Sequence, residues 1–279
     1  MKEILRIEKK QEELSLISGV TFSNVVGWFG ATRKDLKMDL LVPKAVEGHK
    51  PCPCIVWICG GAFMAVDRSV WMPELLRFAR AGYVVASVEY RLTGDAPFPA
   101  QLIDCKSAVR YLRAHSKEYC IDPNRIYAMG ESAGGALASL LGTTAGHPEF
   151  EQGDWLEYSS DVQGVVDFYG LVKVAPAADP TPGLPKWILD AFIFDDFTEE
   201  DGKAASAVDY VTRDCPPVLI LHGSDDTVVD PTQSVMFYET LQRCGVRSDF
   251  LMLEGAAHGD DLFYQDEMID RILAFLGQI

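Results

Sequence analysis

The sequence predicts an α/β fold in which a mostly parallel, twisted sheet is covered by helices on both faces. Short continuous apolar runs recur along the chain, as expected for strands buried on both faces. Segments with helical spacing of apolar residues separate these runs, and buried strands that alternate with helices form a parallel sheet. The chain has 279 residues, 48% of them apolar, so it can form a core without disulfides or metal ions.

The elements follow one another in a regular order. An antiparallel opening is expected over residues 19–42, because residues 36–42 alternate between apolar and polar with period two. Buried strands are expected at residues 55–58, 83–88, 125–129, 162–169, 218–221 and 250–253. Helices are expected at residues 73–80, 99–115, 132–144, 233–244 and 261–276. The pattern therefore predicts eight strands in a single domain, residues 1–279.

One segment interrupts this alternation. Residues 173–206 contain four prolines, several aromatic residues including Trp187, and the acidic pair Asp195-Asp196. Long insertions in compact domains are usually functional lids or binding loops, so we expect a lid over the site here. The alternative is a purely structural excursion of the chain.

Composition excludes several classes of protein. A formal net charge of −16 argues against binding to nucleic acid or to an anionic membrane surface. The seven cysteines are scattered and form no metal-binding motif, as is typical of reduced thiols. Residues 1–10 lack the apolar stretch of a signal peptide, and no segment is long enough to span a membrane. We expect a cytoplasmic protein without cofactor or metal, with a homodimer as an open possibility.

The chemistry centres on Gly130-Glu131-Ser132-Ala133-Gly134, which matches G-x-S-x-G. A buried strand leads into this motif and a helix rich in small residues leaves it, as in a nucleophile elbow. The tight turn lifts the Ser132 hydroxyl out of the sheet, and the helix N-terminus behind it favours negative charge. The alternative, an ordinary glycine-rich turn, does not explain this context.

A serine hydroxyl needs a general base to act as a nucleophile. Enzymes with this elbow place the acid and then the histidine after the serine, and His258 is the one histidine that follows the acid candidates. Three aspartates in the loop after residues 218–221 compete as the acid that orients the imidazole: Asp225, Asp226 and Asp230.

Stabilising an oxyanion requires two or more preorganised N–H donors. The loop Cys59-Gly60-Gly61-Ala62-Phe63 directly follows a predicted strand and can supply the amides of Gly61 and Ala62. The elbow can supply the amide of Ala133. The alternative is a plain glycine turn at the end of the strand.

These motifs together resemble the α/β-hydrolase superfamily, and within it the hormone-sensitive-lipase-like and bacterial acetyl and feruloyl esterases. The resemblance covers the chain from about residue 36 to the C-terminus and includes Tyr90-Arg91-Leu92 and residues 97–101 and 122–126. It implies that Asp226 is the acid, because residues 222–229 resemble the family segment H-G-x-x-D-x-x-V. One departure is clear: Cys59 stands where the family's oxyanion loop usually has histidine.

The resemblance implies a serine carboxylesterase for short-acyl esters, with acetyl esters of plant-derived (xylo-)oligosaccharides as the candidate small-molecule substrate. A feruloyl or aryl esterase, a peptidase of the prolyl-oligopeptidase type, an acyltransferase and a hydrolase-fold binding protein are the rivals. The candidate substrate contacts are Phe63, Trp71, Glu131 and Trp187. Trp71 and Trp187 could form a sugar or phenolic platform, or could equally be core residues.

Overall fold

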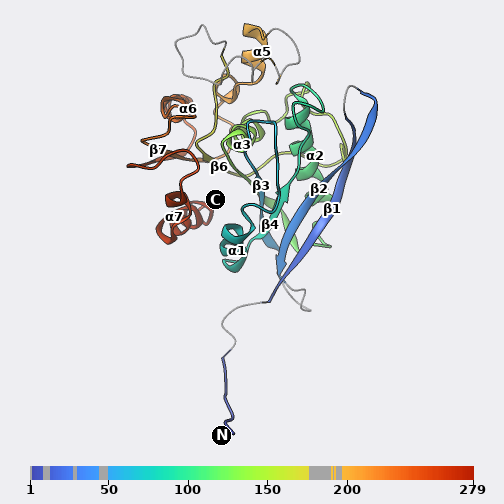
Figure 1. Cartoon of the computed structure of the whole chain (residues 1–279), viewed down its shortest axis with the longest axis vertical. Helices are drawn as coiled ribbons and strands as arrows, with labels where there is room; N and C mark the ends of the chain where they lie inside the picture. Colours follow the sequence, from blue (N-terminus) through green and yellow to red (C-terminus); the bar gives the residue numbers. More distant parts are fainter. Residues whose placement is uncertain are drawn as a thin grey trace.

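The computed structural model describes residues 2–8, 13–27, 30–43, 50–175, 190, 192 and 197–279. Within these ranges, one eight-stranded sheet forms the centre of the molecule, in the order β1-β2-β4-β3-β5-β6-β7-β8 (Figure 1). The strands are β1 (Leu14–Gly27), β2 (Thr32–Pro43), β3 (Cys52–Ile58), β4 (Val84–Val88), β5 (Ile121–Glu131), β6 (Val165–Phe168), β7 (Val218–Gly223) and β8 (Ser248–Leu253).

The sheet is antiparallel only where it begins. Strand β2 pairs antiparallel with both β1 and β4, whereas every neighbouring pair from β4 to β8 is parallel. The prediction of a mostly parallel sheet behind an antiparallel opening is confirmed. Parallel strands place their carboxyl ends along one edge, where ligands bind in such sheets. Residues that follow β3, β5, β7 and β8 therefore meet at this edge.

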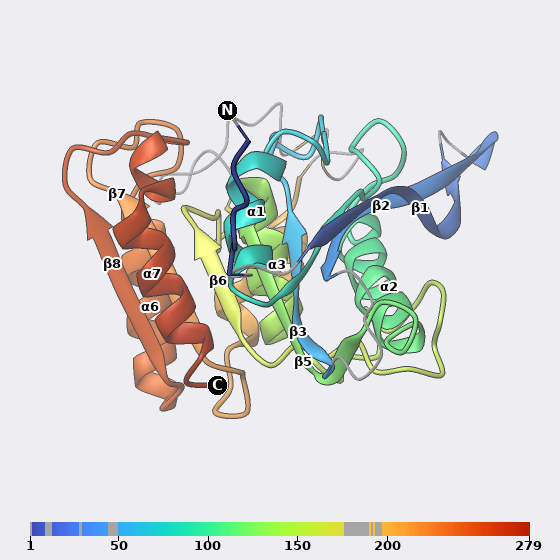
Figure 2. The same cartoon turned by 90° about the horizontal axis from the view of Figure 1, so that it is seen from below.

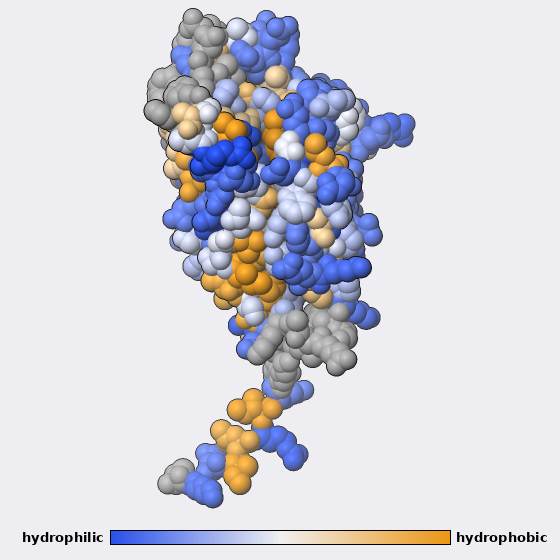
Figure 3. Space-filling model, turned by 90° about the vertical axis from the view of Figure 1, so that its right-hand side faces the viewer, coloured by the Kyte–Doolittle hydropathy of each residue, from blue (hydrophilic) through white to orange (hydrophobic). Residues whose placement is uncertain are grey.

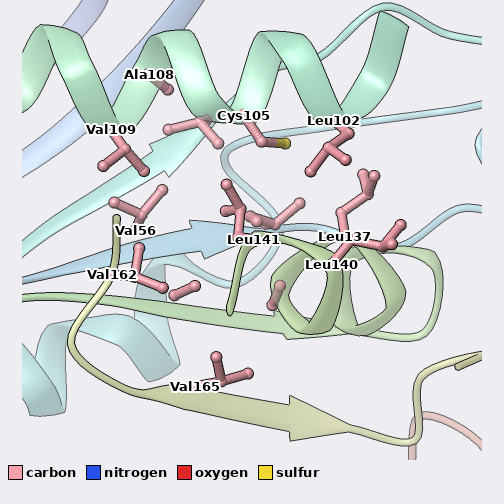
Figure 4. Packing of buried hydrophobic residues seen from close by; sticks show 14 of the residues in the cluster. Val56, Leu102, Cys105, Ala108, Val109, Leu137, Leu140, Leu141, Val162 and Val165 are labelled. Carbon is pink, nitrogen blue, oxygen red and sulfur yellow. The ribbon is translucent and has the colours of Figure 1, made fainter. Parts of the chain in front are cut away.

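Helices cover both faces of the sheet (Figure 2). The cluster of buried residues on one face includes side chains of α1 (Met72–Arg80) and α7 (Asp266–Leu276). The cluster on the other face includes side chains of α2 (Ala100–Ala114), α3 (Ala133–Thr143) and α6 (Thr232–Cys244). Figure 4 shows apolar side chains of α2 and α3 pointing toward one another, with Val56 of β3 beside them. The described residues also form α5 (Glu199–Ala204) and two short 3-10 turns, η2 (Ala207–Tyr210) and η3 (Asp261–Tyr264).

The prediction of one continuous helix over residues 261–276 is wrong. Gln265 is extended, with φ −69° and ψ 158°, and separates η3 from α7. In an uninterrupted helix the Tyr264 carbonyl would accept the amide four residues later. Here that carbonyl accepts a hydrogen bond from the Arg77 guanidinium, and the Met268 amide bonds to Gln265 instead. The contact between Arg77 of α1 and the Tyr264 carbonyl therefore ends η3.

The structure describes both ends of the predicted lid insertion, residues 173–206. The hydroxyl of Ser206 accepts the amide of Val174 at 2.8 Å, which ties the two ends together. Within the insertion, Phe192 packs its ring 4.5 Å from that of Phe63. Trp187 and the acidic pair lie outside the described residues, and lid movement stays a prediction.

The surface combines polar and apolar regions (Figure 3). The N-terminal segment, residues 2–8, extends away from the body and exposes Ile4, Leu5 and Ile7 (Figures 1 and 3). None of the helices in the described ranges combines the length and apolar character needed to cross a bilayer.

Candidate active site

Ser132 lies at the sharp turn between β5 and α3. Its backbone has φ 55° and ψ −120°, a region that residues with a Cβ adopt only under local strain. The turn is held because the Ser132 amide donates to the Phe168 carbonyl of β6 at 2.9 Å. It is also tight: a Cβ at Gly134 would lie 1.9 Å from the Ile58 carbonyl oxygen. This is the strained elbow that the motif predicts.

A histidine and a carboxylate approach this serine from two other strands. The Nε2 of His258, in the loop after β8, lies 2.9 Å from the Ser132 Oγ. Its Nδ1 lies 2.7 Å from the Oδ2 of Asp226, in the loop after β7. With Nδ1–H donating to the carboxylate, the Nε2 lone pair faces the serine hydroxyl and can accept its proton.

The three candidate aspartates lie in different surroundings. Asp225 is exposed and accepts a hydrogen bond from the Ser224 hydroxyl, while Asp230 accepts the amide of Thr232. Of the three side chains, that of Asp226 contacts His258, which agrees with the choice that the family resemblance implies.

Asp226 is held as a carboxylate by several donors. Its Oδ1 accepts the amides of Val228 and Val229 at 2.8 and 2.9 Å. Burial alone would raise the pKa of Asp226, but hydrogen bonds from His222, His258 and these two amides outweigh it and hold the pKa well below its usual range. The carboxylate therefore stays charged beside the imidazole at neutral pH.

His222 is a partner of Asp226 that the motifs did not predict. This buried side chain, at the end of β7, places Nε2 3.2 Å from Asp226 Oδ2 and 2.9 Å from the Val229 carbonyl. Nε2 must carry hydrogen to face two acceptors, and the Ser234 hydroxyl lies 2.6 Å from Nδ1. Its position four residues before Asp226 is the feature of the sequence that indicates this contact.

The predicted oxyanion loop adopts an unusual backbone conformation. Gly61, Ala62 and Phe63 have φ values of 126°, 53° and 60°. For the two residues with a Cβ, such values cost on the order of 1–3 kcal/mol each and persist only when neighbouring groups enforce them. The Ala133 amide opens α3 and has no carbonyl one turn earlier in that helix to accept it. The role of these three amides as oxyanion donors stays a prediction.

The four predicted substrate contacts differ in their surroundings. Phe63 is buried against Phe192, and Trp187 lies outside the described residues. The Glu131 carboxylate faces the predicted oxyanion loop and accepts the Gly60 amide at 2.5 Å. Trp71 is half-buried and stacks on Tyr264, with ring centroids 4.4 Å apart.

A cleft of about 490 Å³ lies between α1 and the chain that follows His258. Its lining includes Trp71, Tyr264 and Gly259, the residue after His258. Its other lining residues are polar: Glu74, Arg77, Asp261, Gln265 and Asp266. A stacked aromatic pair rimmed by carboxylates suits a neutral ligand with many hydroxyl groups. In the described part of the chain, no group of three or more His, Cys, Asp or Glu side chains is arranged to hold a metal ion.

Comparisons with known proteins point to one group of enzymes. The family model described as BD-FAE matches residues 38–241. The esterase LipC of Mycobacterium tuberculosis is 34% identical over 220 residues, covering 76% of this chain and 54% of LipC. The chain spans about half the length of the curated relatives it matches.

Two solved structures are similar over most of both chains. One is described as a truncated form of a carbohydrate esterase from gut microbiota, with TM-score 0.82, 26% identity and coverage of 97% of this chain and 98% of that one. The other is an acetyl ester-xyloside bifunctional hydrolase from Caldicellulosiruptor lactoaceticus, with TM-score 0.73, 25% identity and coverage of 87% and 89%.

Proposed function

The chain belongs to the BD-FAE family and has the α/β-hydrolase fold, and from this premise we propose that it is a serine carboxylesterase for short-acyl esters. The observation that carries the proposal is the continuous line of contacts from Asp226 through His258 to Ser132, at 2.7 and 2.9 Å. Side chains suited to act as nucleophile, base and orienting group thus lie within hydrogen-bonding distance of one another, with the serine on a strained turn and the other two on separate loops.

The proposed reaction proceeds through an acyl-enzyme. Ser132 Oγ attacks the ester carbonyl while its proton passes to His258 Nε2, and the amides of Gly61, Ala62 and Ala133 stabilise the oxyanion. The carbon–oxygen bond to the alcohol then breaks, and His258 returns the proton to the departing oxygen. Water repeats these steps on the acyl-enzyme, releasing the acid and restoring Ser132.

For the substrate, we propose an acetyl ester of a plant-derived oligosaccharide, such as an acetylated xylo-oligosaccharide. The descriptions of the similar carbohydrate esterase and acetyl ester-xyloside hydrolase support this class. The polar cleft supports it too, because Arg77 forms ion pairs with Glu74 and Asp266, which leaves no unpaired cation among the described lining residues to select an acidic substrate. A feruloyl or aryl ester is the alternative, for which Trp71 would stack on the phenolic ring.

The test is hydrolysis of p-nitrophenyl esters from acetate to octanoate by the native protein and by Ser132→Ala. We expect acetate to be fastest and the variant to be inactive. Acetylated xylo-oligosaccharides and methyl ferulate, compared next by kcat/KM, separate the two substrate classes. If the native protein hydrolyses none of these esters, the proposed function is wrong.

A further inference from the structure

The oxyanion loop needs support from outside its own residues. Three consecutive residues, 61–63, have positive φ, and the hydrogen bonds within the loop reach only the Gly61 carbonyl, from the amides of Met64 and Ala65. Cys59 and Gly60 connect this turn to β3. Other elements must therefore hold these two residues in place if the amides of Gly61 and Ala62 are to stay pointed at the oxyanion.

Glu131 provides such a contact from the end of β5, the strand that pairs with β3. Its side chain is buried, and its Oε1 accepts the Gly60 amide at 2.5 Å and the Trp71 indole N–H at 3.3 Å. The packing is direct, because a Cβ at Gly60 would lie 2.6 Å from both carboxylate oxygens. No larger residue than glycine fits at position 60 while the carboxylate stays in place.

Cys59 adds a second attachment. Its Sγ lies 3.7 Å from Glu131 Oε1, and its carbonyl accepts the hydroxyl of the buried Tyr90 at 2.8 Å. Burial, reinforced by the negative charge of Glu131, raises the pKa of the Cys59 thiol to about 12, so the thiol keeps its hydrogen and donates it. The residue that replaces the family's histidine thus still ties the loop down, as a weak donor.

We infer that Glu131 is a positioning residue that holds the oxyanion loop in register with the nucleophile, with Cys59 as its secondary partner. Glu131 directly precedes Ser132, so one rigid turn carries both the attacking hydroxyl and the group that clamps the loop. The carboxylate acts through the loop and not on the reacting atoms, since its hydrogen bonds are to Gly60, Cys59 and Trp71. This inference rests on the proposed esterase function.

The test compares Glu131→Ala, Glu131→Gln and Cys59→Ala with the native protein on p-nitrophenyl acetate. Loss of a single oxyanion donor typically costs about 10²–10³ in rate, so we expect Glu131→Ala to lose about 100-fold in kcat with KM nearly unchanged. Glu131→Gln keeps an acceptor oxygen for the Gly60 amide and should recover most of that loss. Cys59→Ala should lose about two- to tenfold, as expected for one hydrogen bond.

The readout that separates positioning from a general structural role is binding of a transition-state analogue, a trifluoromethyl ketone. Across the three variants its Ki should rise by the same factor as kcat/KM falls, whereas affinity for the product acetate should not change. Glu149→Ala, at an exposed glutamate outside the site, is the matched control and should behave like the native protein.

Glu131→Ala with native kcat and native inhibitor affinity would overturn the inference, as would equal losses in the Ala and Gln variants. If Glu131→Ala does not fold, the comparison of Glu131→Gln with Cys59→Ala still decides: the proportionality between Ki and kcat/KM must hold for both. A native protein that hydrolyses no ester would instead overturn the proposed function on which the inference rests.

Discussion

At the scale of single residues, Asp226 lies between two imidazoles. Its Oδ2 is 2.7 Å from His258 Nδ1 and 3.2 Å from His222 Nε2. Since the His222 N–H also bonds the Val229 carbonyl, His222 fixes the loop and the carboxylate, while His258 stays oriented toward Ser132. The two histidines therefore have separable roles.

Replacing Asp226 with asparagine should leave the geometry nearly intact but favour the wrong tautomer of His258. We expect kcat on p-nitrophenyl acetate to fall by about 10⁴, the loss typical of this change in Ser-His-Asp enzymes. Asp225→Asn, at the exposed neighbour, is the control and should stay within about twofold of native. A variant at Asp226 that retains about a tenth of native kcat would contradict the assigned role.

A second prediction concerns the buried carboxyl group of Asp167, in β6, and the dependence of stability on pH. It is completely buried, and burial raises its pKa to about 6 although the nearby His222 and the Gly170 amide act in the opposite direction. Between about pH 4 and 6 the folded protein therefore keeps a proton that the unfolded chain releases, so the free energy of unfolding falls as pH rises through this range.

The difference between the folded and unfolded pKa of Asp167 corresponds to a fall of about 3 kcal/mol in the free energy of unfolding. The Asp167→Asn variant should not show this fall. Urea unfolding of both proteins across this pH range measures the difference directly. Groups common to both proteins, including Asp226 with its lowered pKa, cancel in that difference. Parallel stability curves for the native protein and the variant would show that Asp167 does not titrate there.

At the scale of elements, the crossing of α3 over β3 depends on the elbow glycines. A Cβ at Gly134 would meet the backbone of Ile58 at 1.9 Å, and backbone cannot move aside as a flexible side chain can. Overpacking typically costs about 1–3 kcal/mol and sometimes more, so Gly134→Ala should lower Tm markedly and disturb Ser132. Gly94→Ala, where the added Cβ meets nothing within 4 Å, should leave Tm unchanged. Equal melting temperatures for the two variants would refute this packing.

The elements that the sequence predicted correctly are those whose pattern is local. The strands predicted at residues 55–58 and 83–88 are continuous apolar runs and are buried. The prediction that residues 250–253 are also buried on both faces is wrong, because β8 lies at the edge of the sheet and leaves Met252 exposed. The order of the motifs along the chain predicts Ser132 and His258, which the structure places 2.9 Å apart. The break at Gln265 was not predictable, because residues 261–276 contain no glycine or proline and the Arg77 contact that ends η3 comes from α1. The sequence predicts a substrate contact for Glu131, whereas the side chain accepts the amide of Gly60. The motif around Ser132 could not indicate this contact, because Gly60 lies 71 residues earlier in the chain.

At the scale of the whole molecule, one sheet carries both clusters of buried residues. Helices α1 and α7 pack on one face and α2, α3 and α6 on the other, so neither cluster can separate without disrupting shared strands. The single-domain prediction therefore implies one cooperative transition in differential scanning calorimetry. Two resolved transitions would instead indicate that part of the chain, such as the insertion at 173–206, folds separately.

The most direct test of the central claim is covalent labelling of the native protein with a fluorophosphonate, followed by intact-mass measurement and peptide mapping. The arrangement of Asp226, His258 and Ser132 predicts one adduct per chain, located on Ser132, absent in Ser132→Ala and formed much more slowly in Asp226→Asn. An adduct on a different residue, or ester hydrolysis by a protein that remains unlabelled, would contradict the assignment of Ser132 as the nucleophile.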